Sequence, residues 1–153
     1  DSKIIKYLPK KYKIVANIPY YLTSRLLRIF LETEQKPQSI TVMIQKEVAE
    51  RIMAKAPNMN LLALSIRAYG TPRVVQKVSR AFFKPQPDVD SAIITITNIN
   101  NSFFIKNNIS EKKFFETTKK AFSKKRKMLR NSINTDSTRR PQELSLEEWV
   151  EYI

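Results

Sequence analysis

The chain has 153 residues, and its 28 Lys and Arg against 14 Asp and Glu give a formal net charge of +14. It has no Cys, which excludes disulfides and thiolate metal sites, and no His, which removes the usual general base and the commonest metal ligand. No apolar run approaches the roughly 20 residues of a membrane span, and the polar start has no signal-peptide core. We therefore expect a cytoplasmic protein with no membrane partner and no metal.

The positive charge favours a polyanionic partner, most simply nucleic acid. The alternative is a generally basic protein, or a genome whose nucleotide bias enriches Lys, Asn and Ile. Gly70 is the single glycine, against an average usage of about 7%. A G-x-G-x-x-G loop that cradles a phosphate or a cofactor is therefore impossible within this chain.

The first 97 residues alternate strand and helix patterns, which predicts an α/β sheet with helices on its faces. Asn60 should cap one of the helices, Gly70 should follow that helix at its C′ position, and Thr23 or Ser24 should cap another. The expected strands are 12–16, which should be buried, 39–44, 74–78 and 90–97, and the expected helices are 23–34, 46–55 and 60–69.

The pattern changes after residue 98. Residues 98–110 contain five Asn without periodicity and indicate a linker. Helical spacing then runs from residue 111 to Ile133, and a polar loop follows at 134–142. Ser145 and Glu148 form a capping-box pattern that predicts a last helix.

Asn17-Ile18-Pro19-Tyr20 follows the first strand directly, at the strand end where open α/β sheets bind ligands. An Asn amide and a neighbouring carbonyl can accept hydrogens from an amino group, and a Tyr ring can stack on a flat heterocycle. The four residues suit a base with an exocyclic amine. The alternative is a simple strand-to-turn junction with a buried Tyr.

Three further segments are candidates. The prolines in 83–91 predict a rigid loop that holds Phe82 or Phe83 over a pocket, or else a connector whose rings fill the core. Residues 45–51 enter a helix with Glu47 and Arg51 four apart, which indicates a surface ion pair and not a catalytic pair. Residues 112–130 hold nine basic residues and one acid, which suits phosphate contacts; the alternative is a solvated helix face.

In this order, four segments resemble the ribosomal RNA adenine N6-dimethyltransferases of the KsgA family over nearly the whole chain. The related Erm resistance methylases share the first type of motif. The segments are Asn17-Ile18-Pro19-Tyr20, Gln45-Lys46-Glu47-Val48-Ala49-Glu50-Arg51, Phe83-x-Pro85-x-Pro87-x-Val89-Asp90-Ser91 and Ala121 to Asn131.

The resemblance implies a class I, Rossmann-like methyltransferase that uses S-adenosylmethionine on two adjacent adenines of small-subunit rRNA. Asn17 and the Ile18 carbonyl would accept the adenine amino hydrogens, and Asn17 would also border the cofactor. Tyr20 would stack on the base, with Phe83 packing from another side, and Pro19 completes the motif. The rRNA contacts would come from Lys124, Lys125, Arg126, Lys127 and Arg130.

The family's glycine-rich cofactor loop lies upstream of this motif, whereas only sixteen residues precede Asn17 here. We therefore expect the C-terminal half of the methyltransferase sheet in residues 1–98, with strand order 4-5-7-6 and the last strand antiparallel. A helical rRNA-binding domain should follow in residues 99–153. Most of the cofactor site would lie upstream, and the open sheet edge would favour association.

Two alternatives to this function remain open at the level of the sequence. The first is a non-catalytic RNA-binding or ribosome-assembly module, in which the basic segment carries the function and Asn17 is structural. The second is an Erm-type methylase that acts on large-subunit rRNA.

Overall fold

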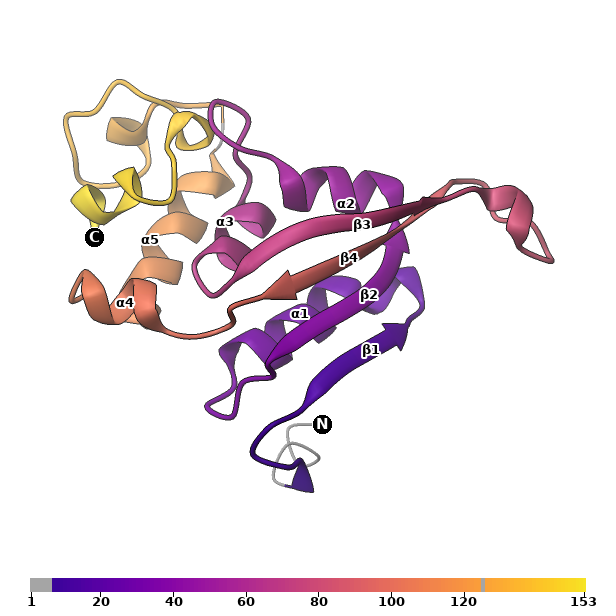
Figure 1. The fold of residues 1–153 in the computed structure, drawn as a ribbon. Coiled ribbons are helices and arrows are strands. Elements are labelled where there is room, and N and C mark those ends of the chain that lie inside the picture. Colours follow the sequence, from indigo (N-terminus) through magenta and orange to yellow (C-terminus); the bar gives the residue numbers. More distant parts are fainter. Residues whose placement is uncertain (1–6, 125) are drawn as a thin grey trace. The chain divides into compact units, whose positions relative to one another are not determined.

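The computed structural model describes residues 7–124 and 126–153. Short 3-10 turns, named η here, connect or follow the helices and strands. The main elements, shown in Figure 1, are β1 (Lys13–Asn17), α1 (Thr23–Glu32), β2 (Ser39–Gln45), α2 (Lys46–Met53), α3 (Leu61–Arg67), β3 (Thr71–Val78), β4 (Ser91–Thr97), α4 (Ser102–Lys106) and α5 (Glu111–Ser123). No helix in the described ranges is long and apolar enough to cross a membrane.

The described chain forms two compact units. Unit 1 holds the described residues up to Met53 together with Tyr69–Asn100, and unit 2 holds Ala54–Ala68 with Asn101–Ile153. The units do not follow the sequence-predicted border at 98/99, because α3 packs on α5 within unit 2. A functional division into domains 1–98 and 99–153 stays a prediction.

Unit 1 is built on one four-stranded sheet with the order β1-β2-β4-β3. β1 is parallel to β2, and β4 is antiparallel to both of its neighbours. This confirms the predicted order 4-5-7-6 with an antiparallel last strand. The ends of β1, β2 and β3 and the start of β4 therefore share one edge, which we call the carboxyl edge and define by Asn17, Gln45, Val78 and Ser91.

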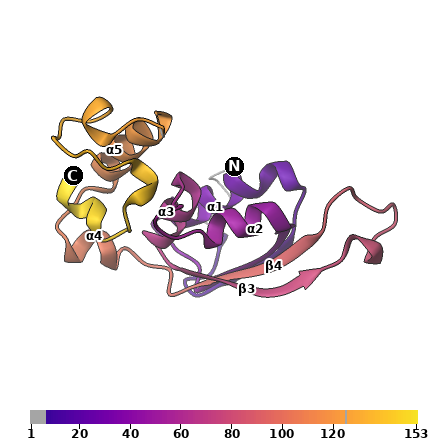
Figure 2. The same cartoon turned by 90° about the horizontal axis from the view of Figure 1, so that it is seen from above.

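Helices α1 and α2 lie on the same side of the sheet (Figure 2). The strand residues on that face are almost fully buried, at 2% exposure or less: Ile40, Val42, Ile44, Ala92, Ile94 and Ile96. On the opposite face Val15 is 82% exposed. The expected first strand is thus present, but its predicted burial is wrong, because β1 lies at the edge of a sheet that the described helices cover on one face.

Of the two predicted N-terminal helix caps, one is confirmed and the other is wrong. Asn60 caps α3 as expected, because its side chain accepts a hydrogen bond of 3.0 Å from the Ala63 amide. The cap predicted at Thr23 or Ser24 is wrong: α1 continues from a 3-10 turn after Leu22, and no side chain caps it. Helix α1 therefore relies on burying Thr23 and its apolar face.

The C′ position predicted for Gly70 is wrong, because α3 has its C-cap at Ala68, two residues earlier, and Gly70 does not have a positive φ. The physical reason for glycine is close packing, since an added Cβ would lie 2.9 Å from the Thr97 carbonyl oxygen. Thr71 pairs with Thr97, so Gly70 lies at the sheet edge opposite the carboxyl edge.

Unit 2 contains a helix that the sequence analysis missed. Helix α4 interrupts the expected 98–110 linker and buries Phe104. Phe104 meets Phe103 and Phe114 edge to face, with ring centroids 5.3 and 5.5 Å apart. Helix α5 ends at Ser123 instead of continuing toward Ile133, and the chain then turns into η4 (Leu129–Asn131).

The capping box near the C-terminus is confirmed. The Ser145 amide donates to Glu148 Oε2 at 2.8 Å, and the Glu148 amide donates to Ser145 Oγ at 3.3 Å. The element that follows is a 3-10 turn, η6 (Glu148–Tyr152), which buries Trp149 completely.

Candidate functional site

The turn Asn17-Ile18-Pro19-Tyr20 leads from the sheet into α1. Asn17 is the last residue of β1 and pairs with Met43. Pro19 has φ −54° and ψ 135°, and its carbonyl accepts a hydrogen bond of 2.9 Å from the Leu22 amide. Proline fixes φ and keeps the preceding residue extended, so the chain leaves the strand straight before it turns into η2 (Tyr20–Leu22).

The turn presents its polar groups at the carboxyl edge. Asn17 is exposed, and Ile18 and Tyr20 are half-buried. An accessible amide oxygen next to a backbone carbonyl can accept two hydrogens from one amino group. The geometry thus places the predicted recognition groups where a base could reach them.

The turn is joined to the proline-containing loop by a hydrogen bond that no local pattern predicts. The hydroxyls of Tyr20 and Ser91 lie 3.0 Å apart. Ser91 is 0% exposed and pairs across the sheet with Gln45 on one side and Val78 on the other. Two of the sequence motifs therefore meet in one contact.

The loop before Ser91 is itself held by backbone donors. The amides of Arg80 and Lys46 donate to the Asp90 carboxylate and the Asp90 carbonyl, at 3.1 and 3.0 Å. The Arg80 guanidinium donates to the Asp88 carbonyl at 3.0 Å. These bonds fix the start of β4, and with it the position of Ser91.

The two candidate phenylalanines differ in exposure. Phe82 is 83% exposed, whereas Phe83 is half-buried and its amide donates to the Arg80 carbonyl at 3.2 Å. Their loop extends beyond the sheet between the end of β3 and the start of β4 (Figure 1). Packing of Phe83 against a bound base stays a prediction.

A pocket beside this loop has a lining with more acidic than basic side chains. Its charged groups are four carboxylates and two cations, and like charges repel an anion. The lining residues are Lys46, Glu47, Glu50, Arg80, Asp88, Val89 and Asp90. The interpretation of residues 45–51 as non-catalytic stays a prediction.

The basic segment of unit 2 is exposed. Lys124, Arg126, Lys127 and Arg130 are all exposed, and Lys125 lies outside the described residues. The backbone near the end of the segment is held at Leu129. The Leu129 amide donates to the Arg139 carbonyl at 2.8 Å, and the Leu129 side chain is completely buried. The segment thus combines an anchored backbone with cations at the surface.

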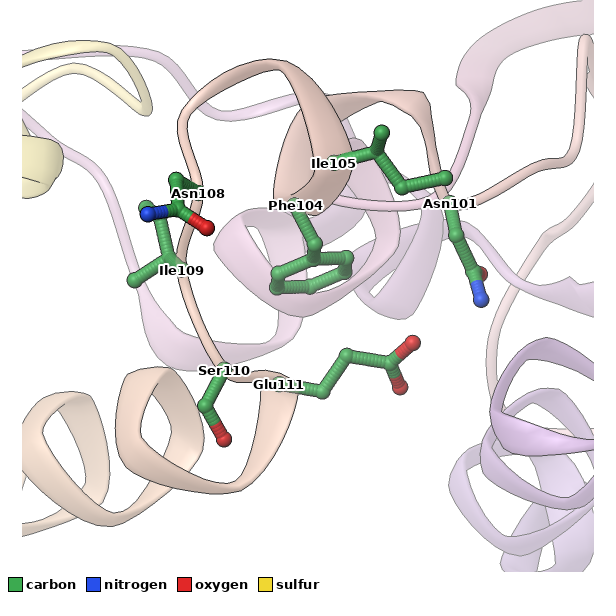
Figure 3. A pocket seen from close by; sticks show the side chains of 7 residues that line it. All are labelled: Asn101, Phe104, Ile105, Asn108, Ile109, Ser110 and Glu111. Carbon is green, nitrogen blue, oxygen red and sulfur yellow. The ribbon is translucent and has the colours of Figure 1, made fainter.

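Unit 2 also contains an open pocket next to α4 (Figure 3). Asn101 Oδ1 is buried there without a hydrogen-bond partner, and Ile105 is 76% exposed. The lining residues are Asn101, Phe104, Ile105, Asn108, Ile109, Ser110 and Glu111. Sequence reasoning missed this pocket because the Asn-rich stretch resembled a linker.

A family-model comparison decides how these features are interpreted. The model described as ribosomal RNA adenine dimethylase matches residues 6–151. The chain belongs to the ribosomal RNA adenine dimethylase family. This confirms the resemblance to the KsgA family that the four motifs indicated.

The curated relatives agree with this family. A protein from Dehalococcoides mccartyi named ribosomal RNA small subunit methyltransferase A is 41% identical over 97% of this chain and 59% of its own length. A protein of the same name from Fusobacterium nucleatum is 40% identical over 85% of this chain and 49% of its own length. The chain therefore spans about half the length of these relatives.

Two solved structures share the fold. A dimethyladenosine transferase from Plasmodium falciparum matches with a TM-score of 0.78 at 22% identity, over 95% of this chain and 66% of that one. The 23S rRNA methyltransferase ErmE matches with a TM-score of 0.60 at 20% identity and the same coverage. The predicted Rossmann-like methyltransferase fold class is confirmed.

These 153 residues include a single glycine, so they contain no glycine-rich loop. Gly70, the single glycine, packs against the Thr97 carbonyl at the edge opposite Asn17, so it cannot serve a cofactor loop at the carboxyl edge. No group of three or more Asp and Glu side chains in the described ranges could hold a metal ion.

Proposed function

We propose that the protein carrying this chain dimethylates N6 of two adjacent adenosines in small-subunit rRNA with S-adenosylmethionine as methyl donor. The observation that carries the proposal is the accessible Asn17 turn at the carboxyl edge, joined through Tyr20 to Ser91, in a chain of the rRNA adenine dimethylase family. The names of the relatives support the small subunit as the target.

In this proposal the chain supplies base recognition. The Asn17 side chain and the Ile18 carbonyl accept the two N6 hydrogens, which orients the N6 lone pair and draws electron density toward it. Tyr20 stacks on the extruded base, and Phe83 closes another side, which offsets the cost of unstacking. The reaction then relies on positioning and charge stabilisation, which fits a chain without histidine.

S-adenosylmethionine supplies the methyl group, and we propose that most of its site lies outside these 153 residues. Asn17 is the one residue here that we place next to it. The 153-residue chain should therefore bind the cofactor weakly or not at all. Titration calorimetry tests this, and micromolar affinity of the chain alone would contradict it.

The rRNA, within an immature small subunit in the cytoplasm, would be held by Lys124, Lys125, Arg126, Lys127 and Arg130 in a helical rRNA-binding domain, 99–153. This assignment is supported by the exposure of the described members of this set. Phosphate contacts from such residues give affinity without sequence readout.

We also propose that the outer edge of β1 is a surface through which chains associate. In the described residues β1 pairs with β2 alone, which leaves its outer backbone groups without a strand partner. Open edges favour association. Light scattering of the 153-residue chain should show concentration-dependent oligomers, and a monomer at all concentrations would contradict this.

The central experiment is Asn17→Ala in the full protein that carries this chain. We expect loss of methyl transfer with RNA affinity nearly unchanged, because Asn17 contacts the reacting amine and not the phosphates. Asn58→Ala, which changes another exposed Asn, is the control and should retain activity. Equal loss of activity and RNA affinity in Asn17→Ala would argue against the assigned role.

The two alternatives are tested by other outcomes. A non-catalytic assembly module would lose all function when Lys124, Lys125, Arg126 and Lys127 are neutralised, whereas an enzyme would retain turnover at low salt. An Erm-type methylase would modify large-subunit rRNA in vitro. The similarity to ErmE is one of fold, and the relatives' names favour the small subunit.

A further inference from the structure

Ser91 has a contact that gives it a role beyond filling the core. Its side chain is 0% exposed, and its hydroxyl lies 3.0 Å from the hydroxyl of Tyr20. A buried hydroxyl without solvent needs a partner within the protein. The two residues are 71 positions apart, so this contact joins the start of β4 to the turn after β1.

The Tyr20 side chain is only partly covered by the surrounding protein. Tyr20 begins the short turn η2, which has no buried residue. The next residue, Tyr21, is 83% exposed. Tyr20 itself is half-buried, so packing covers only part of its side chain, and the hydrogen bond to Ser91 adds a contact at its hydroxyl end.

Ser91, in contrast, is fixed on every side. It pairs with Gln45 and Val78 on the two neighbouring strands. The preceding residue, Asp90, accepts from the Lys46 amide at 3.0 Å and from the Arg80 amide at 3.1 Å. The rigid partner in this pair is Ser91, and the partner that gains order is Tyr20.

We propose that Ser91 is a positioning residue that holds the Tyr20 ring in the orientation in which it stacks on the target adenine. The inference rests on the proposed function. It assigns the loop that ends at Asp90 a second task, since the loop sets the position of Ser91 and thereby that of the ring. Ser91 itself does not touch the base.

The expected kinetic effect falls on kcat. Affinity for RNA comes mainly from phosphate contacts, which Ser91 does not make. A misplaced ring lowers the fraction of bound RNA whose adenine is correctly seated. Ser91→Ala in the full protein should therefore lower kcat about 5- to 20-fold, the effect of one lost hydrogen bond, and leave KM within about twofold.

A double-mutant cycle isolates the bond. Tyr20→Phe keeps the ring but removes the same hydroxyl pair from the other side. If the bond is what matters, Ser91→Ala and Tyr20→Phe each lower kcat, and the double variant is no worse than the poorer single variant. If the fold-decrease in kcat of the double variant equalled the product of the two single decreases, the two hydroxyls would act independently and the inference would be overturned.

Thr95→Val is the matched structural control. Thr95 lies on the same strand, is 5% exposed and shares a hydroxyl contact of 3.0 Å with Thr41. This variant also loses a buried hydroxyl pair, but it should keep kcat. An equal fall in kcat for Thr95→Val would show a general weakening of β4 and would overturn the inference.

A readout without turnover completes the test. With 13C-labelled tyrosine in the full protein, Ser91→Ala should shift the Tyr20 ring signal, and Thr95→Val should not. An unchanged Tyr20 signal in Ser91→Ala overturns the inference, as does full activity of Ser91→Ala in an active protein. If the proposed function itself were wrong, the unmutated protein would methylate no rRNA. That result is distinguishable from an unchanged Tyr20 signal and from full activity of Ser91→Ala.

Discussion

The turn Asn17-Ile18-Pro19-Tyr20 in unit 1 and the basic residues 124–130 in unit 2 differ in how their side chains are held. In the turn, Tyr20 is bonded to the fully buried Ser91, whose own position is set by two strands and a loop. In the segment, Lys124, Arg126 and Lys127 are exposed, and what is anchored is the backbone.

The difference follows from what each region is proposed to do. Transfer to one amine requires the base within a fraction of an ångström of its reactive position, so the groups that contact it must be pre-organised. Phosphate attraction acts over several ångströms and tolerates side-chain motion. One region should therefore respond steeply to the loss of a single hydrogen bond, and the other should respond to the number of charges.

The largest expected effect comes from the anchor of the basic segment. Leu129→Ala removes a completely buried side chain from η4 and should lower the free energy of unfolding of unit 2 by about 2–5 kcal/mol. Ile105→Ala, at a 76% exposed position, should change little. Denaturant melts of both variants measure this, and equal stability for the two would contradict a role for Leu129 as an anchor.

The second effect is electrostatic. Replacing Lys124, Lys125, Arg126 and Lys127 by Gln should weaken rRNA binding about 100-fold or more at physiological salt and reduce the slope of log K against log salt by about 3. Fluorescence anisotropy over a salt series measures both quantities. At low salt and saturating RNA, kcat should recover.

The matched control removes the same number of charges from α5, by replacing the exposed Lys112, Lys113, Lys119 and Lys120 with Gln. It should weaken binding less. An equal loss would mean that the total positive charge, and not the cluster at 124–127, determines affinity.

The third effect concerns close packing in unit 1. Gly70→Ala would bring a Cβ to 2.9 Å from the Thr97 carbonyl oxygen and 3.0 Å from Ile96 Cγ2. Backbone oxygen cannot yield as a side chain does, so unfolding free energy should fall by about 1–3 kcal/mol. Since this edge is remote from Asn17, RNA affinity should not change. An unchanged free energy of unfolding would contradict the role of Gly70 in close packing against Thr97.

The sequence allowed parts of the fold to be predicted where local patterns determine the structure. The Asn60 cap and the Ser145–Glu148 capping box are local hydrogen-bond patterns, and both are present. The strand order followed from the family resemblance. Helix α4 was missed because five residues are too few for helical periodicity to be detected.

Other features depend on contacts between distant residues. The exposure of Val15 depends on what covers the sheet, and the need for glycine at position 70 depends on Thr97. For the candidate site, the motifs predicted Asn17 and Tyr20 as site residues and contained Ser91, but they did not predict the contact between Tyr20 and Ser91. That hydrogen bond spans 71 positions, so only the fold brings its partners together.

The smallest expected effect tests whether a surface ion pair matters to unit 2. The hydrogen bond from the Arg139 guanidinium, and after it the hydrogen bond from the Ser145 amide, lower the pKa of Glu148 from 4.5 to about 2. A lowered folded-state pKa means that the stabilisation is present above pH 4.5 and is lost as the pH falls toward 2.

Because both side chains of this pair are about 40% exposed, solvent screens it and the effect on stability should be modest. Thermal melts between pH 6 and pH 2.5 should show a smaller acid-induced loss for Glu148→Gln than for the unmutated protein, while Glu147→Gln, at the exposed neighbouring position, should behave like the unmutated protein. If Glu148→Gln lost as much stability in acid as the unmutated protein, the pair would have no share in the acid sensitivity of unit 2. The stability of the protein in acid would then depend on buried contacts, such as those around Leu129 and Ser91.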